Sequence, residues 1–189
     1  MNEVELIRGH LTLERQHAAE VARACVSALA TSAPQDTERL ATLEAFRQAG
    51  VEYLVWMLSR FEEREQVFHD LLRGRFPAED HNRRAVETAL ALPGTSREAL
   101  AKLETALGST VDSDSTATRW TDFLRFFSGA WNARRDEIDR LFERQAKVAD
   151  WRTVSDIDAD SIVDERSRYA RVKATLPAGV EMSPTASHL

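Results

Sequence analysis

The chain has 189 residues, of which 43% are hydrophobic and 30% are charged, and its formal net charge is −6. This length and balance predict one globular domain with a core of its own. The acidic excess argues against nucleic acid as the main partner, and no apolar stretch is long enough for a membrane span, so a cytoplasmic protein is expected. The single cysteine, Cys25, excludes an internal disulfide and is predicted to be a core residue.

Apolar residues at helical spacing predict two long helices in the first part of the chain. The first is expected from about Glu3 to Leu29. The second begins near Asp36 or Thr37 and continues to Leu72, with Gly50 as a candidate bend. Gly74 and Pro77 follow it as helix-ending residues.

Shorter helices and a further long one are predicted after that point. In chain order, the predicted helices are Glu79–Leu92, Arg97–Leu107 after the Pro93-Gly94 break, a long aromatic-rich helix over about Ala117–Val148, and a last helix from Asp156 or Asp158 to about Ala174. A polar loop is predicted over 108–116, before the long helix. Long helices with short connections are typical of up-and-down bundles. The predicted fold is all-α: an up-and-down four-helix bundle with an additional short helix and a C-terminal helix. It is expected to form one domain over residues 1–176, followed by a flexible tail over 177–189.

Titratable side chains fall on the apolar faces of the two N-terminal helices. Spacings of four and three place three of them within roughly 60° of one another on the first helix: His10, Glu14 and His17. The second helix carries a similar set among its apolar residues: Glu62, Glu65 and His69. An unpaired buried charge costs several kcal/mol, so these groups need partners inside the protein.

One interpretation of this polar interior is a metal site. Imidazole and carboxylate ligands on facing helices suit iron, manganese or zinc, and iron in a mononuclear or dinuclear centre is expected first. His10, His17 and His69 would then be nitrogen ligands, and Glu14 and Glu65 oxygen ligands. Glu62 would be an alternate ligand, and Arg134 would orient a carboxylate or a small polar or diatomic ligand. Whether the chain is an enzyme stays open.

Two other interpretations use the same residues without a metal. A guanidinium, such as that of Arg134, would neutralise Glu14 or Glu65 and fix the register of the helices. The protein would then be a non-enzymatic interaction or regulatory bundle with a metal-free His/Glu/Arg network. The third interpretation is a pocket for a small polar or aromatic ligand beside Trp131.

Three segments resemble a known family. Arg-Phe-Glu-Glu-Arg-Glu-Gln-Val-Phe, residues 60–68, is similar to the His-Phe-x-x-Glu-Glu segment of hemerythrin-like, cation-binding bundles. The helix of His10 resembles their first helix, and residues 131–142 resemble their last. The resemblance covers about the first 147 residues and implies a non-haem di-iron bundle that binds oxygen or nitric oxide, or handles iron.

The chain departs from that family at several ligand positions. Arg60 and Arg64 stand where the family's second helix has a histidine and a glutamate. The third region offers only His81 where two histidines are expected, and the fourth has none. A five-histidine centre is therefore excluded. The resemblance implies a bundle of that shape with a remodelled, carboxylate-richer site, or a relative that has lost its metal.

Overall fold

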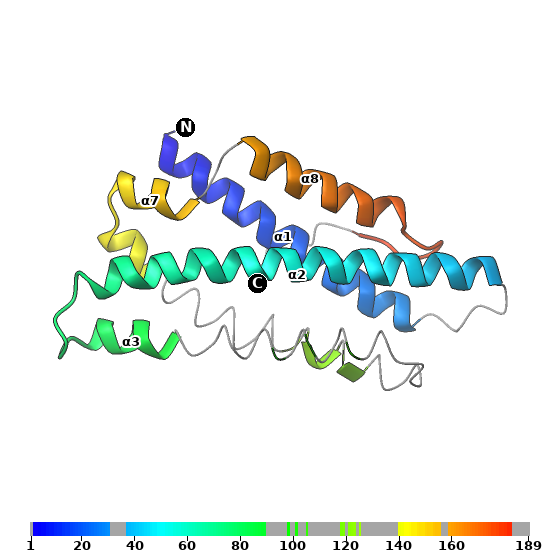
Figure 1. Cartoon of the computed structure of the whole chain (residues 1–189), viewed down its shortest axis with the longest axis horizontal. Coiled ribbons are helices and arrows are strands. Elements are labelled where there is room, and N and C mark those ends of the chain that lie inside the picture. Colours follow the sequence, from blue (N-terminus) through cyan, green and yellow to red (C-terminus); the bar gives the residue numbers. More distant parts are fainter. Residues whose placement is uncertain are drawn as a thin grey trace.

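The computed structural model describes residues 2–30, 37–89, 98, 101, 105, 118–119, 121–123, 125, 140–155 and 159–182 (Figure 1). Every regular element in these residues is a helix, which confirms the all-α prediction. The named helices are α1 (Glu3–Ala30), α2 (Thr37–Arg73), α3 (His81–Ala89), α7 (Val148–Ser155) and α8 (Ala159–Ala174). Among the helices so described, none has the length and apolar character that a membrane crossing requires.

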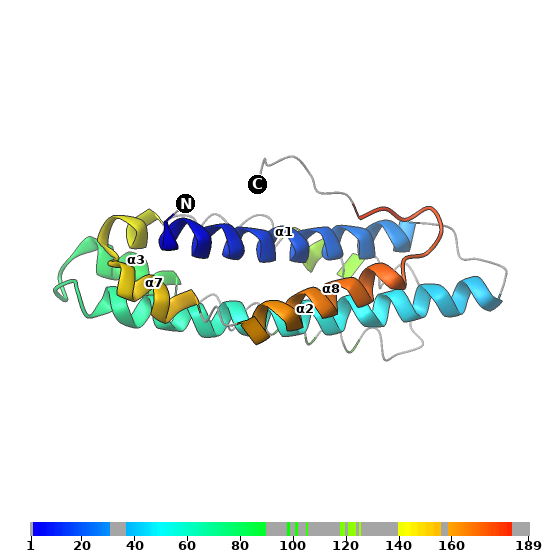
Figure 2. The same ribbon diagram turned by 90° about the horizontal axis from the view of Figure 1, so that it is seen from above.

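The helices α1 and α2 are antiparallel, and α8 lies along both of them in the same direction as α1 (Figures 1 and 2). The short helices α3 and α7 pack at the end of the molecule where α2 ends. Most of the predicted helix over 117–148 falls outside the described residues, as do most of the predicted helix over 97–107 and the loop over 108–116. The up-and-down four-helix arrangement therefore stays a prediction.

Local hydrogen bonds fix where two of the helices begin. At the start of α1, the Asn2 side chain accepts from the Glu5 backbone N–H at 2.9 Å, and the Glu5 carboxylate accepts from the Asn2 N–H at 2.8 Å. This reciprocal pair satisfies two donors that a helix start leaves open. At α3, the Asp80 side chain accepts from the Asn82 N–H at 2.8 Å, so the helix begins at His81 and not at the predicted Glu79.

The seam between α1 and α2 combines small residues with large ones. The α1 side is fully buried and consists mainly of small side chains, and α2 supplies Phe46, Tyr53, Leu54 and Phe61. A Cβ built on Gly50 would lie 2.6 Å from the Cys25 sulfur. Glycine at this position therefore permits a close approach of the two helices, and α2 continues through it as one helix where a bend was considered.

A second apolar cluster joins α2 to the residues before and within α7. The rings of Phe68, Phe142 and Trp151 meet edge to face, with centroids 4.0 to 6.1 Å apart. The prediction of one helix through Val148 is wrong at its end, because residues 146–147 are not helical and α7 follows. Asp150 explains the break, since its carboxylate accepts from the Lys147 N–H at 2.7 Å.

The chain stays packed beyond the predicted domain end at residue 176. Val180 is buried, and Leu176 and Met182 pack against the core between α1, α2 and α8. The packed region therefore includes residues up to Met182, six more than expected from the small residues after Pro177. The predicted tail from 183 onward lies outside the described residues.

Candidate functional site

The buried face of α1 carries a glutamate at its centre. Ile7, Leu11, Glu14, Ala18 and Val21 recur every three or four residues and are at most 5% exposed. Glu14 itself has no exposed surface, as the helical spacing predicted. Leu6 and Leu13 of the same helix are exposed although they are apolar, so the buried face is the one that carries Ile7 and Leu11.

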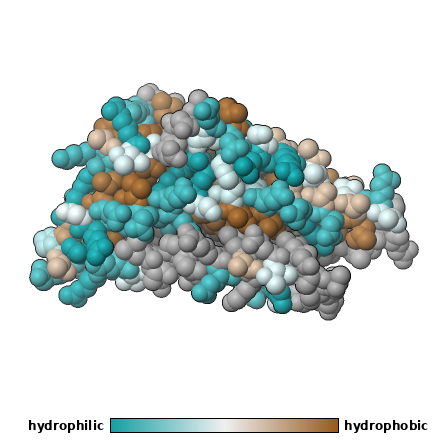
Figure 3. All heavy atoms as spheres, viewed as in Figure 1, coloured by the Kyte–Doolittle hydropathy of each residue, from teal (hydrophilic) through white to brown (hydrophobic). Residues whose placement is uncertain are grey.

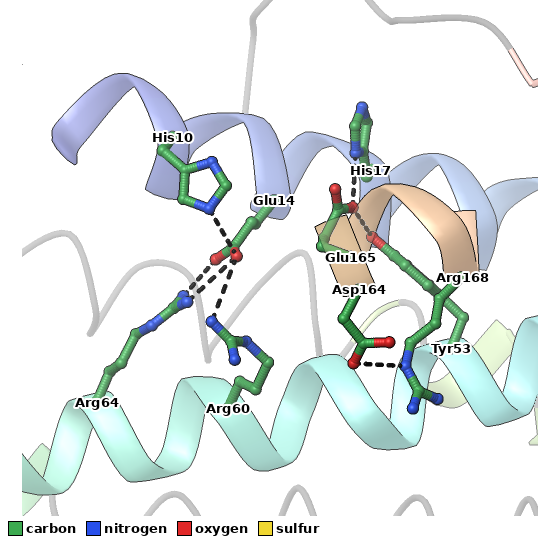
Figure 4. Close-up of polar contacts among 9 residues, drawn as sticks. All are labelled: His10, Glu14, His17, Tyr53, Arg60, Arg64, Asp164, Glu165 and Arg168. Atoms are coloured by element: carbon green, nitrogen blue, oxygen red, sulfur yellow. Dashed lines mark hydrogen bonds and ion pairs between the residues drawn. The ribbon is translucent and has the colours of Figure 1, made fainter. Parts of the chain in front are cut away.

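Glu14 is held by three basic side chains (Figure 4). Arg64 of α2 contacts both carboxylate oxygens, with Nη2 3.1 Å from Oε1 and Nη1 against Oε2. Arg60, one turn earlier on α2, brings Nη2 to 3.8 Å from Oε1. His10 Nε2 lies 3.1 Å from the same oxygen. Glu14 is thus enclosed between a helical neighbour and two arginines of the facing helix.

These partners decide the charge state of Glu14. Burial by itself raises the pKa of its carboxyl, but His10 and Arg64 outweigh burial and bring the pKa down to about 2. Glu14 is therefore ionised at neutral pH, and its lone pairs face guanidinium groups. A divalent cation at this carboxylate would have to displace Arg64 and would be repelled by two positive charges.

A second buried carboxylate lies further along α1 and comes from α8. Glu165 is 1% exposed, and its Oε1 is 2.8 Å from both His17 Nδ1 and the Tyr53 hydroxyl. One carboxylate thus joins α8 to α1 and to α2 (Figure 4). Burial and the charge of Glu165 raise the pKa of Tyr53, which stays a hydroxyl donor. Because an ionised carboxylate only accepts, His17 presents Nδ1–H to Glu165.

An aromatic ring of α8 completes this contact. Tyr169 stacks on the His17 ring with centroids 3.8 Å apart and planes within 8°. Its hydroxyl donates to Glu20, which is also buried. Burial, with a further contribution from Glu20, raises the pKa of Tyr169. A carboxylate-oriented histidine is an arrangement used for general bases, and it serves equally as a polar tie between helices.

The remaining predicted site residues on α2 have different surroundings. His69 is 2% exposed, and its Nδ1 has no hydrogen-bond partner among the described residues. Glu62 is buried, whereas Glu65 is only partly buried. Both glutamates have interaction partners within the protein. Arg134 lies outside the described residues, as does Trp131.

Of the predicted ligands on α1, the structure brings His10 and Glu14 into contact. Glu14 is also bound by Arg64, and His17 contacts Glu165 of α8. Among the residues the structure describes, no three or more His, Cys, Asp or Glu side chains are grouped so that they could hold a metal ion. The iron centre expected from the sequence stays a prediction.

Four residues of these clusters were not assigned a site role from the sequence: Arg60, Arg64, Tyr53 and Glu165. A signal was present in the sequence for the three charged ones. Arg60 and Arg64 are one turn apart on the face of α2 that also carries Phe61 and Phe68. Glu165 lies in the spacing Ser161, Glu165, Val172 of buried residues on α8. Charged residues inside an apolar stripe indicate buried partners of opposite charge, and Arg60, Arg64 and Glu165 are such residues. Tyr53 has no comparable signal, because a tyrosine in an apolar stripe is an ordinary core residue.

Comparison of the chain with family models, with curated proteins and with solved structures gives no match.

Proposed function

We propose that this chain is a non-enzymatic interaction or regulatory bundle with a metal-free network of His, Glu and Arg side chains in its interior. The observation that carries the proposal is the enclosure of Glu14 by Arg64 and Arg60. In the proposed bundle, α1 and α2 pair with the helix predicted over 117–148 in an up-and-down four-helix arrangement, and α8 closes one side.

The Glu14–Arg64 pair gives the network a defined role in the proposal. Arg64 is 6% exposed and Glu14 fully buried, so neither charge can turn to water. Sliding α1 along α2 by one turn would leave Arg64 without its carboxylate, and a slide away from Arg60 would leave Glu14 without a guanidinium as well, at a cost of about 3–5 kcal/mol. The pair therefore favours one register of the two helices, and a single register presents one constant outer surface to a partner.

The closing helix α8 depends on similar contacts. Glu165 bonds to α1 and α2, and Arg168 of α8 lies over the Trp56 ring of α2, 4.9 Å from its centroid. The Arg60 guanidinium lies over the same ring at 4.9 Å. Polar contacts of this kind give specificity of docking more than raw stability.

Metal content separates this proposal from the iron-binding alternative. The full chain, purified from iron-supplemented medium, should contain far less than one iron per chain by mass spectrometry. The comparison protein is the Glu65→Ala, His69→Ala variant, which should not differ from the wild type. Near-stoichiometric iron in the wild type that is lost from this variant would overturn the proposal and support a hemerythrin-like iron centre.

A double-mutant cycle tests the pair itself. Glu14→Leu alone should lower the free energy of unfolding by about 3–5 kcal/mol, because it leaves the buried Arg64 charge unpaired. Arg64→Leu alone should also lower it, because the buried Glu14 then keeps only Arg60 and His10 as partners. The double variant should be less destabilised than either single variant, since both charges are then gone. Glu63→Gln, on the exposed side of α2, is the control and should change stability by less than about 0.5 kcal/mol. Additive losses in the double variant would contradict the pairing.

A further inference from the structure

A cavity outside the Glu14 and Glu165 clusters lies at the end of the molecule where α7 packs on α1 and α2. Its volume is about 390 Å³, within the roughly 300–1,000 Å³ of small-molecule sites. The walls come from α1, α2, α7 and residues 140–145. Four separate segments therefore shape it, and it is a feature of the tertiary structure.

Arginine side chains gather around this cavity. Arg8, Arg15 and Arg140 line it, and Glu143 is the one carboxylate among its lining residues. Glu143 forms an ion pair with Arg8 at the more exposed side. Three guanidinium groups thus meet at one cavity, in a chain whose net charge is −6. A guanidinium is the side-chain group whose planar fork best matches a carboxylate.

The floor of the cavity is apolar and rigid. Leu11, Phe68 and Trp151 contribute to it, and each is at most 6% exposed. Phe142 packs edge to face against both aromatic rings from behind, with centroids 4.0 and 5.1 Å away. On the face shown in Figure 3, apolar atoms gather between α7 and α2. The aromatic surface is thus preformed, and a ligand would not have to order it.

We propose that this cavity binds a small amphipathic organic anion, a carboxylate with an aromatic or aliphatic body. Its head group would lie against Arg15 and Arg140, whose planar forks match a carboxylate, and its body against Trp151 and Phe68. Arg15 and Arg140 also interact within the protein, so the ligand shares side chains that are already positioned. An inorganic anion would use the charge and leave the aromatic floor uncovered.

Calorimetric titration of the full chain tests both halves of the proposal. The probes are 4-phenylbutyrate, its neutral analogue 4-phenylbutan-1-ol, and inorganic phosphate. We expect 4-phenylbutyrate to bind with a dissociation constant of about 1 mM or below. The alcohol and phosphate should each bind at least about tenfold more weakly, because one lacks the charge and the other the apolar body.

Two arginine variants assign the binding to this cavity. Arg15→Gln and Arg140→Gln should each weaken 4-phenylbutyrate binding by about tenfold. Arg166→Gln, an exposed position on α8, should leave it unchanged. Thermal unfolding of each variant confirms that it is folded before titration. Absence of 4-phenylbutyrate binding, equal binding of the alcohol or of phosphate, or wild-type affinity in both cavity variants would overturn the proposal.

Discussion

Acidification should destabilise this protein through His69, a buried imidazole in the C-terminal half of α2. Only 2% of the residue is exposed, and burial lowers its pKa from 6.5 to about 4, with the Asp70 charge acting weakly in the opposite direction. The folded state therefore holds His69 neutral at a pH where the unfolded chain already binds a proton. Because the unfolded state binds more protons, stability falls as the pH falls from 6.5 to 4.

The size of the effect follows from the two pKa values. A folded pKa of about 4 against 6.5 in the unfolded chain gives a full loss of about 3 kcal/mol, at about 1.4 kcal/mol for each tenfold change. Of this, about 2 kcal/mol should be lost between about pH 7.5 and about pH 5. Glu14 acts in a lower window, because its pKa of about 2 keeps its contribution intact until the pH falls below 4.5.

Urea unfolding followed by circular dichroism at these two pH values measures the difference. His69→Leu cannot take up the proton, so its free energy of unfolding should fall by about 2 kcal/mol less than that of the wild type over the same range. His81→Leu removes an exposed histidine of α3 and should keep the wild-type dependence. Equal pH dependence of the wild type and His69→Leu would refute the assignment of His69 as a buried neutral group.

Two further substitutions test how the helices pack. Gly50→Ala should lower the free energy of unfolding by about 1–2 kcal/mol, because the added methyl would lie 2.6 Å from the Cys25 sulfur and overpacking outweighs the better helix propensity of alanine. In a Cys25→Ala background the same change should be neutral or stabilising by urea titration; an unchanged loss would contradict the close approach. Glu165→Ala should cost about 2 kcal/mol, since it leaves His17 and Tyr53 without their common acceptor. Glu165→Gln keeps an acceptor oxygen and should cost less than half as much in the same assay, whereas equal losses would show that the acceptor is not what matters.

Local pattern was enough to predict the helices and part of the polar interior. The spacing of apolar residues gave α1 and α2 to within one or two residues of their ends, and it placed Glu14 inside. It failed at α7, because the helix break depends on Asp150, whose carboxylate is also held by Arg75 of the turn after α2. A cap supported from 75 residues away leaves no periodic signal in the sequence.

The amino-acid sequence by itself determined that the chain is helical and that charged groups enter its core, since both follow from spacing within single helices. Only the tertiary structure decided which charges meet. Glu14 and Arg64 are 50 residues apart, and His17 and Glu165 are 148 apart. Their pairing depends on how far one helix is shifted along another, and that shift is set by close packing at places such as Gly50 against Cys25. Spacing alone leaves a metal or an arginine as the partner of Glu14, and in the folded chain that carboxylate contacts Arg64.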